Sequence, residues 1–201
     1  MKLSKFKIAA GESLEKVPAR GANFVCAGDV SVNGKTYEAE QGFYTEHEQS
    51  VSSTYGAHMI VFSVSDKASS SPTTDLLLAQ EFSWPENEFV LRLDQVSFPE
   101  GGIAYRHIHA GAGIRYLASG QLQIQSDHHE QGIEVGASWF EDVNSPVKAV
   151  AKGRGVTRFV RALVLPLAFE GKSTINYLNS EDAEKPKLQS NHRFFDQIVR
   201  L

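Results

Sequence analysis

Residues 101–120 read GGIAYRHIHAGAGIRYLASG, and this stretch decides the fold of the chain. It contains two histidines, His107 and His109, separated by a single residue. Because alternate side chains of a β-strand share a face, Tyr105, His107 and His109 are predicted to point the same way. Two imidazoles on one face of a strand can chelate a borderline metal ion such as Zn, Fe, Mn or Ni.

Glycines frame this histidine pair. Five residues separate Gly101 from His107, and Gly120 ends the apolar run that follows His109. This spacing resembles the first motif of the cupin family, G-x5-H-x-H-x3,4-E-x6-G, at both glycines and both histidines. The glutamate of the motif is missing, because Gly113 stands in its place.

The second cupin motif, G-x5-P-x-G-x2-H-x3-N, is matched less completely. Gly136 is in place, but no histidine occurs near Val147 or Lys148. The resemblance implies an all-β fold of double-stranded β-helix (jelly-roll) barrels. It also implies a divalent metal, Zn, Fe, Mn or Ni, held by the two ligands that remain, His107 and His109. The alternative is that these are hydrogen-bonded histidines of the barrel interior that hold no metal.

Composition narrows the class of protein. The chain has 201 residues, a net charge of −4 and no basic stripe, which argues against a nucleic-acid partner. A single cysteine, Cys26, allows no internal disulfide and fits a reducing compartment. The N-terminal apolar run is too short for a signal peptide, and no run approaches the roughly 20 apolar residues of a membrane span. We therefore expect a cytoplasmic protein without a membrane partner.

Short β-rich runs alternate with Gly, Asn, Asp and Ser along most of the chain, as in an antiparallel jelly roll. A repeat with an offset of 92 residues aligns Gly28 with Gly120, and it places Glu15 and Val17 opposite His107 and His109. The sequence thus predicts two barrels in tandem, a bicupin, with the histidine pair only in the second. The expected divisions are a degenerate N-terminal barrel (1–68), a linker (69–87) centred on Ser69–Pro72, a C-terminal barrel (88–180) and an extension (181–201).

Four further residues are candidates for ligand binding. Arg115 has the parity of an inward-facing residue and could bind a carboxylate, or it could pair with an acid for stability. Tyr105 could orient a ligand or simply pack. Trp139 is expected in the core or in the pocket wall, like its neighbour Phe140. Glu141 is the acid placed to replace the missing metal ligand or to act as a general base.

Three functions remain open. The sequence favours a small-molecule-binding bicupin with a divalent metal in its C-terminal barrel and a small anionic ligand, a carboxylate. A metal-dependent dioxygenase or isomerase is the first alternative, and a structural homodimer with a vestigial site is the second. Since one fold serves all three functions, the fold alone cannot decide whether the protein is an enzyme.

Overall fold

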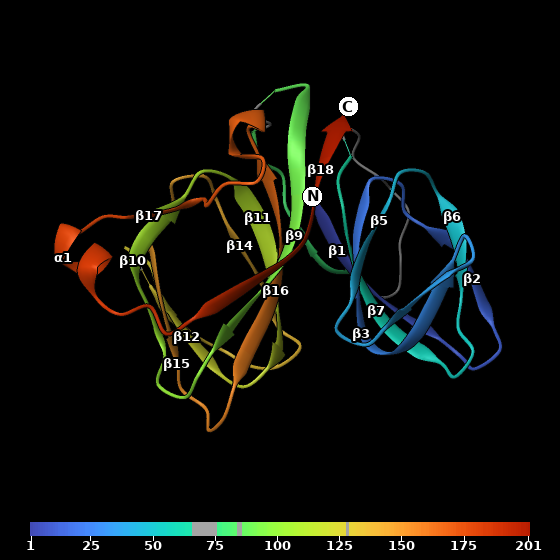
Figure 1. Ribbon diagram of the computed structural model, residues 1–201, viewed down its shortest axis with the longest axis horizontal. Coiled ribbons are helices and arrows are strands. Elements are labelled where there is room, and N and C mark those ends of the chain that lie inside the picture. The colour runs from blue at the N-terminus through green and yellow to red at the C-terminus, as the bar shows by residue number, and fades with distance from the viewer. Residues whose placement is uncertain (66–75, 84–85, 128) are drawn as a thin grey trace. The chain divides into compact units, whose positions relative to one another are not determined.

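The computed structural model describes residues 1–65, 76–83, 86–127 and 129–201, which form two units built almost wholly from antiparallel strands (Figure 1). The first unit comprises Met1–Glu81 together with Val199–Leu201, and the second comprises Phe82–Ile198. The predicted linker core, Ser69–Pro72, lies outside the described residues, and Leu76–Ala79 of the predicted linker range forms a strand.

The first unit contains one eight-stranded sheet in the order β2-β6-β3-β7-β1-β8, with β4 and β5 also paired to β3. Its long strand β3 bends and pairs with β7 and β5 through one half, and with β4 and β6 through the other. The strands are β1 (Lys2–Ile8), β2 (Ser13–Val17), β3 (Gly21–Val32), β4 (Lys35–Glu38), β5 (Gly42–Thr45), β6 (Gln49–Ser52), β7 (Ala57–Ser63) and β8 (Leu76–Ala79).

The second unit contains two five-stranded sheets, β13-β12-β15-β10-β17 and β14-β11-β16-β9-β18. The strands are β9 (Glu88–Phe98), β10 (Ile103–His109), β11 (Ala112–Ser119), β12 (Leu122–Gln125), β13 (Glu130–Ile133), β14 (Ser138–Glu141), β15 (Val147–Ala151), β16 (Thr157–Leu165), β17 (Ile175–Tyr177) and β18 (Ser190–Arg200). A 3-10 helix, η1 (Leu167–Phe169), and a short helix, α1 (Ser180–Glu184), precede β17 and β18 respectively.

The two units share a pattern of strand pairing. In the first, β7 pairs with β1 and β3, β3 with β5, and β6 with β2 and β3. In the second, β16 pairs with β9 and β11, β11 with β14, and β15 with β10 and β12. The β3–β7 and β11–β16 ladders also shift register around Cys26 and Ala118, which are 92 positions apart.

The glycines of the predicted frame lie where backbone geometry requires them. Gly101 has a φ of 69° and Gly120 a φ of 78°, in the left-handed region that residues with a Cβ rarely adopt. Gly28, the partner of Gly120 in the repeat, has nearly the same φ of 79°. The turns that these residues make allow the strands on either side to pack across the barrel.

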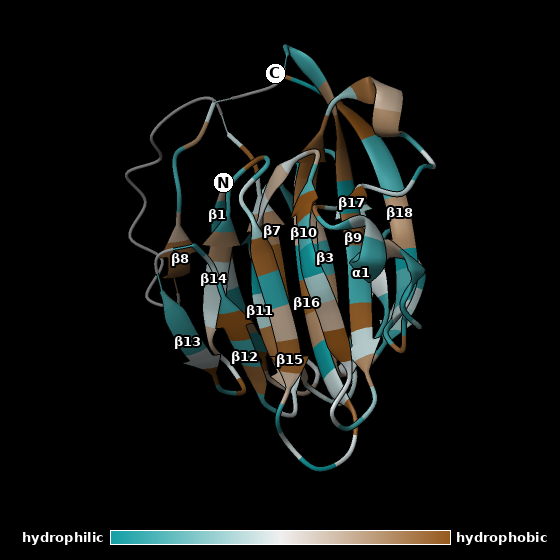
Figure 2. Cartoon of the chain, turned by 90° about the vertical axis from the view of Figure 1, so that its left-hand side faces the viewer, coloured by the Kyte–Doolittle hydropathy of each residue, from teal (hydrophilic) through white to brown (hydrophobic). Residues whose placement is uncertain are grey.

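The core of the second unit lies between its two sheets. Burial alternates along β12 and β15, and the inward residues join Phe98, Trp139 and Phe159 in one apolar cluster. Figure 2 shows the resulting alternation of hydrophobic and hydrophilic bands along the strands. The predicted all-β class is confirmed. Among the described residues, no helix has the length and apolar character needed to cross a membrane.

Candidate ligand-binding site

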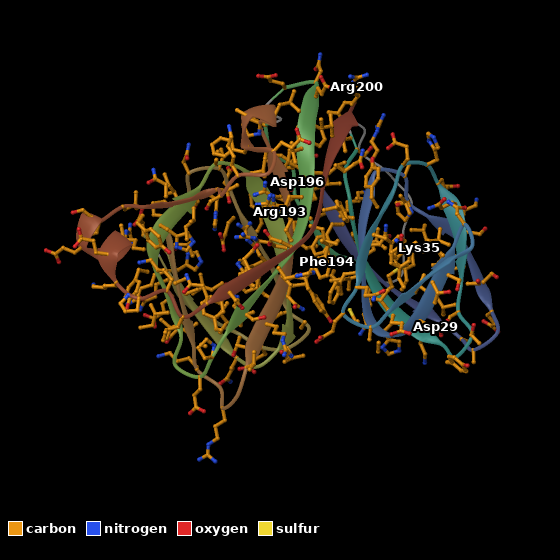
Figure 3. The ribbon with its side chains drawn as sticks, viewed as in Figure 1. Asp29, Lys35, Arg193, Phe194, Asp196 and Arg200 are labelled. Atoms are coloured by element: carbon orange, nitrogen blue, oxygen red, sulfur yellow. The ribbon has the colours of Figure 1, made fainter. Side chains whose placement is uncertain are left out.

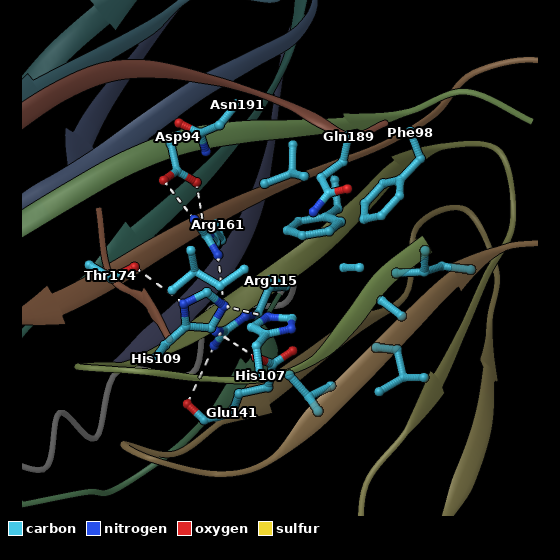
Figure 4. A pocket seen from close by; sticks show the side chains of 18 of the residues that line it. Asp94, Phe98, His107, His109, Arg115, Glu141, Arg161, Thr174, Gln189 and Asn191 are labelled. Atoms are coloured by element: carbon cyan, nitrogen blue, oxygen red, sulfur yellow. Dashed lines mark hydrogen bonds and ion pairs between the residues drawn. The ribbon is translucent and has the colours of Figure 1, made fainter. Parts of the chain in front are cut away.

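A cavity of about 350 Å³ lies within the second unit. The charged side chains gather on one side of it together with the histidines, while Phe98 lies on the other, beside Gln189 (Figure 4). The apolar lining is formed by Val96, Phe98, Ala104, Leu122, Ile124, Trp139, Val147, Ala149, Phe159 and Ile175. The polar lining includes Arg92, Asp94, His107, His109, Arg115, Glu141, Arg161, Thr174, Tyr177, Gln189, Asn191 and Arg193.

The predicted histidine pair lines this cavity. His107 and His109 are each about 5% exposed, and their Nε2 atoms lie 3.1 Å apart. Nδ1 of His107 lies 2.6 Å from the carbonyl oxygen of Tyr105 and so must carry a proton and donate it. In the neutral ring, Nε2 of His107 therefore presents a lone pair to the cavity.

A third side chain, Arg161, completes the histidine cluster. Its Nη1 lies 3.1 Å from Nε2 of His109, and a guanidinium can only donate, so this imidazole nitrogen accepts. His109 then carries its proton on Nδ1, which is 3.2 Å from Oγ1 of Thr174 in the segment leading into β17. Asp94 of β9 holds Arg161 with two bonds, Nε to Oδ1 at 2.6 Å and Nη2 to Oδ2 at 3.1 Å.

Both imidazoles are neutral near pH 7. Burial lowers the pKa of His107, because the charged ring would lose its water, although the Tyr105 carbonyl opposes this effect. Burial lowers the pKa of His109 well below its usual range, and the positive charges of Arg161 and Arg115 lower it further.

Arg115 lies fully buried beside the histidines, as predicted from its parity. It pairs with Glu141 of the adjacent strand, with Nη2 2.8 Å from Oε2, and its Nη1 donates to the carbonyl of Gly113 at 2.5 Å. The ion pair is poorly aligned, so Nη2 makes no hydrogen bond despite this distance. Burial lowers the pKa of Arg115 to about 10, which still leaves the guanidinium charged near pH 7.

Trp139 stands directly opposite Arg115 across β11 and β14 and lines the cavity, whereas its neighbour Phe140 does not. The indole Nε1 donates to Oε1 of Glu141 at 2.8 Å. With Arg115 at its other oxygen, Glu141 has both oxygens engaged, which leaves it poorly placed to act as a metal ligand or as a general base.

Tyr105 does not share the face of the histidines, and this prediction is wrong. The β10–β15 ladder shifts register between Ala104 and His107, so a bulge at residues 105–106 breaks the alternation of side chains. Ala104 and His107 line the cavity, and Tyr105 does not. Its ring lies 4.9 Å from the ammonium of Lys185 and 5.5 Å from that of Lys187.

The side chains around the histidines do not fit a resident divalent metal. Within the described part of the chain, no group of three or more His, Cys, Asp or Glu side chains is arranged to hold one. A Cβ at Gly113, the position of the missing glutamate, would lie 2.1 Å from the carbonyl oxygen of Ala162. Val147 lies opposite His107 in the ladder and contributes only an apolar side chain.

Sequence reasoning missed Asp94, Arg161 and Thr174, which come from three other elements. The signal for two of them was available, since Arg161 is the single charged residue of the apolar run FVRALVL and Asp94 lies with Arg92 in the largely apolar run VLRLDQV. Such residues are rarely buried unless they are paired. Thr174 carried no such signal.

The C-terminal segment also contributes to the lining. Arg193 and Asp196 of β18 lie close together, and Asp196 holds Arg92 of β9 through two bonds of 2.6 and 2.8 Å (Figure 3). Gln189 and Arg193 line the cavity, and each has a buried atom without a hydrogen-bond partner, Oε1 and Nε. Part of the predicted C-terminal extension is thus a wall of the site.

Several solved structures resemble this chain in their fold. AerE from Microcystis aeruginosa aligns over 81% of this chain and 87% of its own, with a TM-score of 0.57 and 15% identity. The formate complex of Lactobacillus farciminis oxalate decarboxylase aligns over 92% and 82%, with a TM-score of 0.60 and 13% identity. A cupin 2 conserved barrel domain protein from Leptotrichia buccalis aligns over 82% and 87%, with a TM-score of 0.49 and 16% identity.

The sequence matches no family model and no curated protein. At these low identities the structural likeness concerns the fold. The chain has the cupin double-stranded β-helix, as predicted from the glycine frame of residues 101–120.

Proposed function

We propose that this protein is a bicupin that binds a small carboxylate with an apolar body in the cavity of its C-terminal barrel. The observation that carries the proposal is Nη2 of Arg115, a buried cationic donor beside the cavity: its close partner is Oε2 of Glu141 at 2.8 Å, and this ion pair lacks hydrogen-bond alignment. Buried donors are normally satisfied, and a ligand oxygen would satisfy this one.

The charge of the lining supports an anion. Four arginines line the cavity, Arg92, Arg115, Arg161 and Arg193, against the carboxylates of Asp94 and Glu141. Asp196, which pairs with Arg92 and Arg193, is the third carboxylate that balances these four arginines. Because both histidines are neutral, the lining keeps an excess of one positive charge. The cavity volume of about 350 Å³ lies at the lower end of the range for ligand pockets, which favours a small molecule.

The apolar lining supports a hydrocarbon or aromatic body. Phe159 makes aromatic contacts with both Phe98 and Trp139, with ring centroids 6.0 and 5.4 Å apart. A carboxylate bound at Arg115 could extend its body toward these rings, and the buried apolar area would add about 25 cal/mol for each Å² removed from water.

Only the second barrel carries this chemistry. By strand register, Val17 of the first unit corresponds to His107 of the second. The offset between these two residues is 90 positions, whereas the offset around Cys26 is 92. Val61 takes the place of Arg161. Both valines belong to a buried apolar cluster of the first unit. The loss of the imidazole and the guanidinium favours a structural role for that barrel.

The Arg115–Glu141 pair also has a neutral counterpart in the first unit. Asn23 and Thr45 occupy the equivalent register, and Asn23 Nδ2 donates to Thr45 Oγ1 at 3.2 Å. An uncharged pair occupies this part of the interior and provides no positive charge to attract an anion. We therefore expect one ligand for each chain.

Matched acids and amides test the proposal. In a thermal-shift assay, phenylacetate and related small carboxylates should raise the melting temperature, and phenylacetamide should not, because a ligand that binds only the folded state stabilises it by mass action. Equal stabilisation by both, or none by either, would overturn the proposal.

Arg115→Lys provides the specific control. Lysine keeps a positive charge but removes Nη2, and losing a hydrogen bond to a charged group costs about 1.5–3 kcal/mol, a roughly ten- to hundred-fold loss of acid affinity. Arg106→Lys, at an exposed arginine paired with Asp127, should leave acid binding unchanged.

A further inference from the structure

The two histidines have the spacing of neighbouring metal ligands. Their Nε2 atoms are 3.1 Å apart, as expected for two nitrogens that are each about 2.1 Å from one ion and subtend roughly a right angle there.

The guanidinium of Arg161 contacts one of these two nitrogens. Its Nη1 is 3.1 Å from His109 Nε2, so the lone pair that a metal would need already accepts a hydrogen bond. The group also brings a positive charge, which repels a second cation strongly inside a protein.

Asp94 fixes the guanidinium in this position. It binds Arg161 with two bonds across the β9–β16 ladder, where the two residues stand directly opposite each other, and its side chain is only 2% exposed. The same two bonds occupy a carboxylate that could otherwise approach an ion at the histidines. Arg161 thus removes two metal-ligating groups at once, the His109 imidazole and the Asp94 carboxylate.

We propose that Arg161, held by Asp94, takes the place of a metal ion in this barrel: its guanidinium caps His109, one of the two histidines, and excludes divalent cations. The inference does not depend on the proposed ligand. A metal measurement tests it, whereas acid binding tests the proposed function, so either can fail alone.

Substitution of Arg161 should create a metal site. Wild type, Arg161→Ala and Arg161→Ala/His109→Ala would each be incubated with Zn²⁺, dialysed against metal-free buffer and measured by mass spectrometry of the metal. We expect wild type to retain far less than one ion per chain and Arg161→Ala to approach stoichiometric retention. The double variant should return to the wild-type level, because it lacks one of the two imidazoles. Arg106→Ala, at an exposed arginine, should match wild type.

A second pair of variants guards against misfolding. Arg161→Ala leaves Asp94 buried without its partner, which can cost several kcal/mol. Arg161→Met/Asp94→Asn removes both charges together and should fold while still freeing His109, as checked by circular dichroism. Arg161→Lys keeps the cation and should keep Zn²⁺ out. The proposal is overturned if folded variants without a cation at position 161 retain no more Zn²⁺ than wild type. It is equally overturned if the wild type retains about one metal ion per chain and the double variant His107→Ala/His109→Ala loses that ion.

Discussion

The Arg115–Glu141 ion pair should respond unequally to the loss of its two members. The Arg115 side chain is 1% exposed and that of Glu141 is 14% exposed. Removing one partner of a buried ion pair costs about 3–5 kcal/mol, because the other charge is left without compensation. Glu141→Gln strands a fully buried guanidinium that retains only carbonyl acceptors, Gly113 O at 2.5 Å and Glu141 O at 3.4 Å. We expect a loss in the upper half of that range.

Arg115→Met should cost less. It leaves a carboxylate at Glu141 that keeps the hydrogen bond from Trp139 Nε1 and retains some access to water. The loss should fall near about 3 kcal/mol, the lower end of the same range. In the double variant Arg115→Met/Glu141→Gln no charge is stranded, so its cost should be smaller than the sum of the two single costs by more than about 1 kcal/mol.

Urea unfolding followed by circular dichroism would measure these free energies. The reasoning is refuted if Arg115→Met costs more than Glu141→Gln. It is also refuted if each single variant costs under about 1 kcal/mol, as for an exposed ion pair.

Three further predictions concern the same barrel. The low pKa of buried His109 means that the unfolded chain binds its proton first as pH falls. The free energy of unfolding of the wild type should therefore decline as the pH falls from about 7 to 5.5, by up to about 1.4 kcal/mol per pH unit. Urea unfolding of the wild type and of His109→Gln should show a less steep decline in the variant. Gly113→Ala should lower the melting temperature, because its Cβ would meet the Ala162 carbonyl at 2.1 Å, whereas Gly132→Ala, with no atom within 4 Å, should not. Ala149→Phe should fill the cavity and abolish acid-induced stabilisation in thermal-shift assays, whereas Val150→Phe, on the outer face of the same strand, should preserve it.

The fold and the polar core of the site could be predicted because their signals are local. One stretch of 20 residues contains both signals. Gly101 and Gly120, which have positive φ angles, stand at its ends, and the closely spaced His107 and His109 lie between them. The inward direction of Arg115 likewise followed from strand parity within that stretch.

The rest depended on contacts that no local pattern records. The bulge at residues 105–106 turns Tyr105 away from the cavity, and strand alternation cannot foresee a bulge. Arg161 reaches His109 from a strand 52 positions later, and its direction is fixed by Asp94, 67 positions before it. The histidine pair alone suggested a metal, and only these long-range partners show that the Nε2 lone pair of His109 meets a guanidinium instead.

A crystal structure of the protein soaked with phenylacetate would test the central claim most directly. We predict the carboxylate within hydrogen-bonding distance of Arg115 Nη2, the aromatic ring against Phe98 and Phe159, and the Arg161 guanidinium still capping His109. A metal ion bound between His107 and His109, or a cavity that contains no phenylacetate at saturating concentration, would contradict the account.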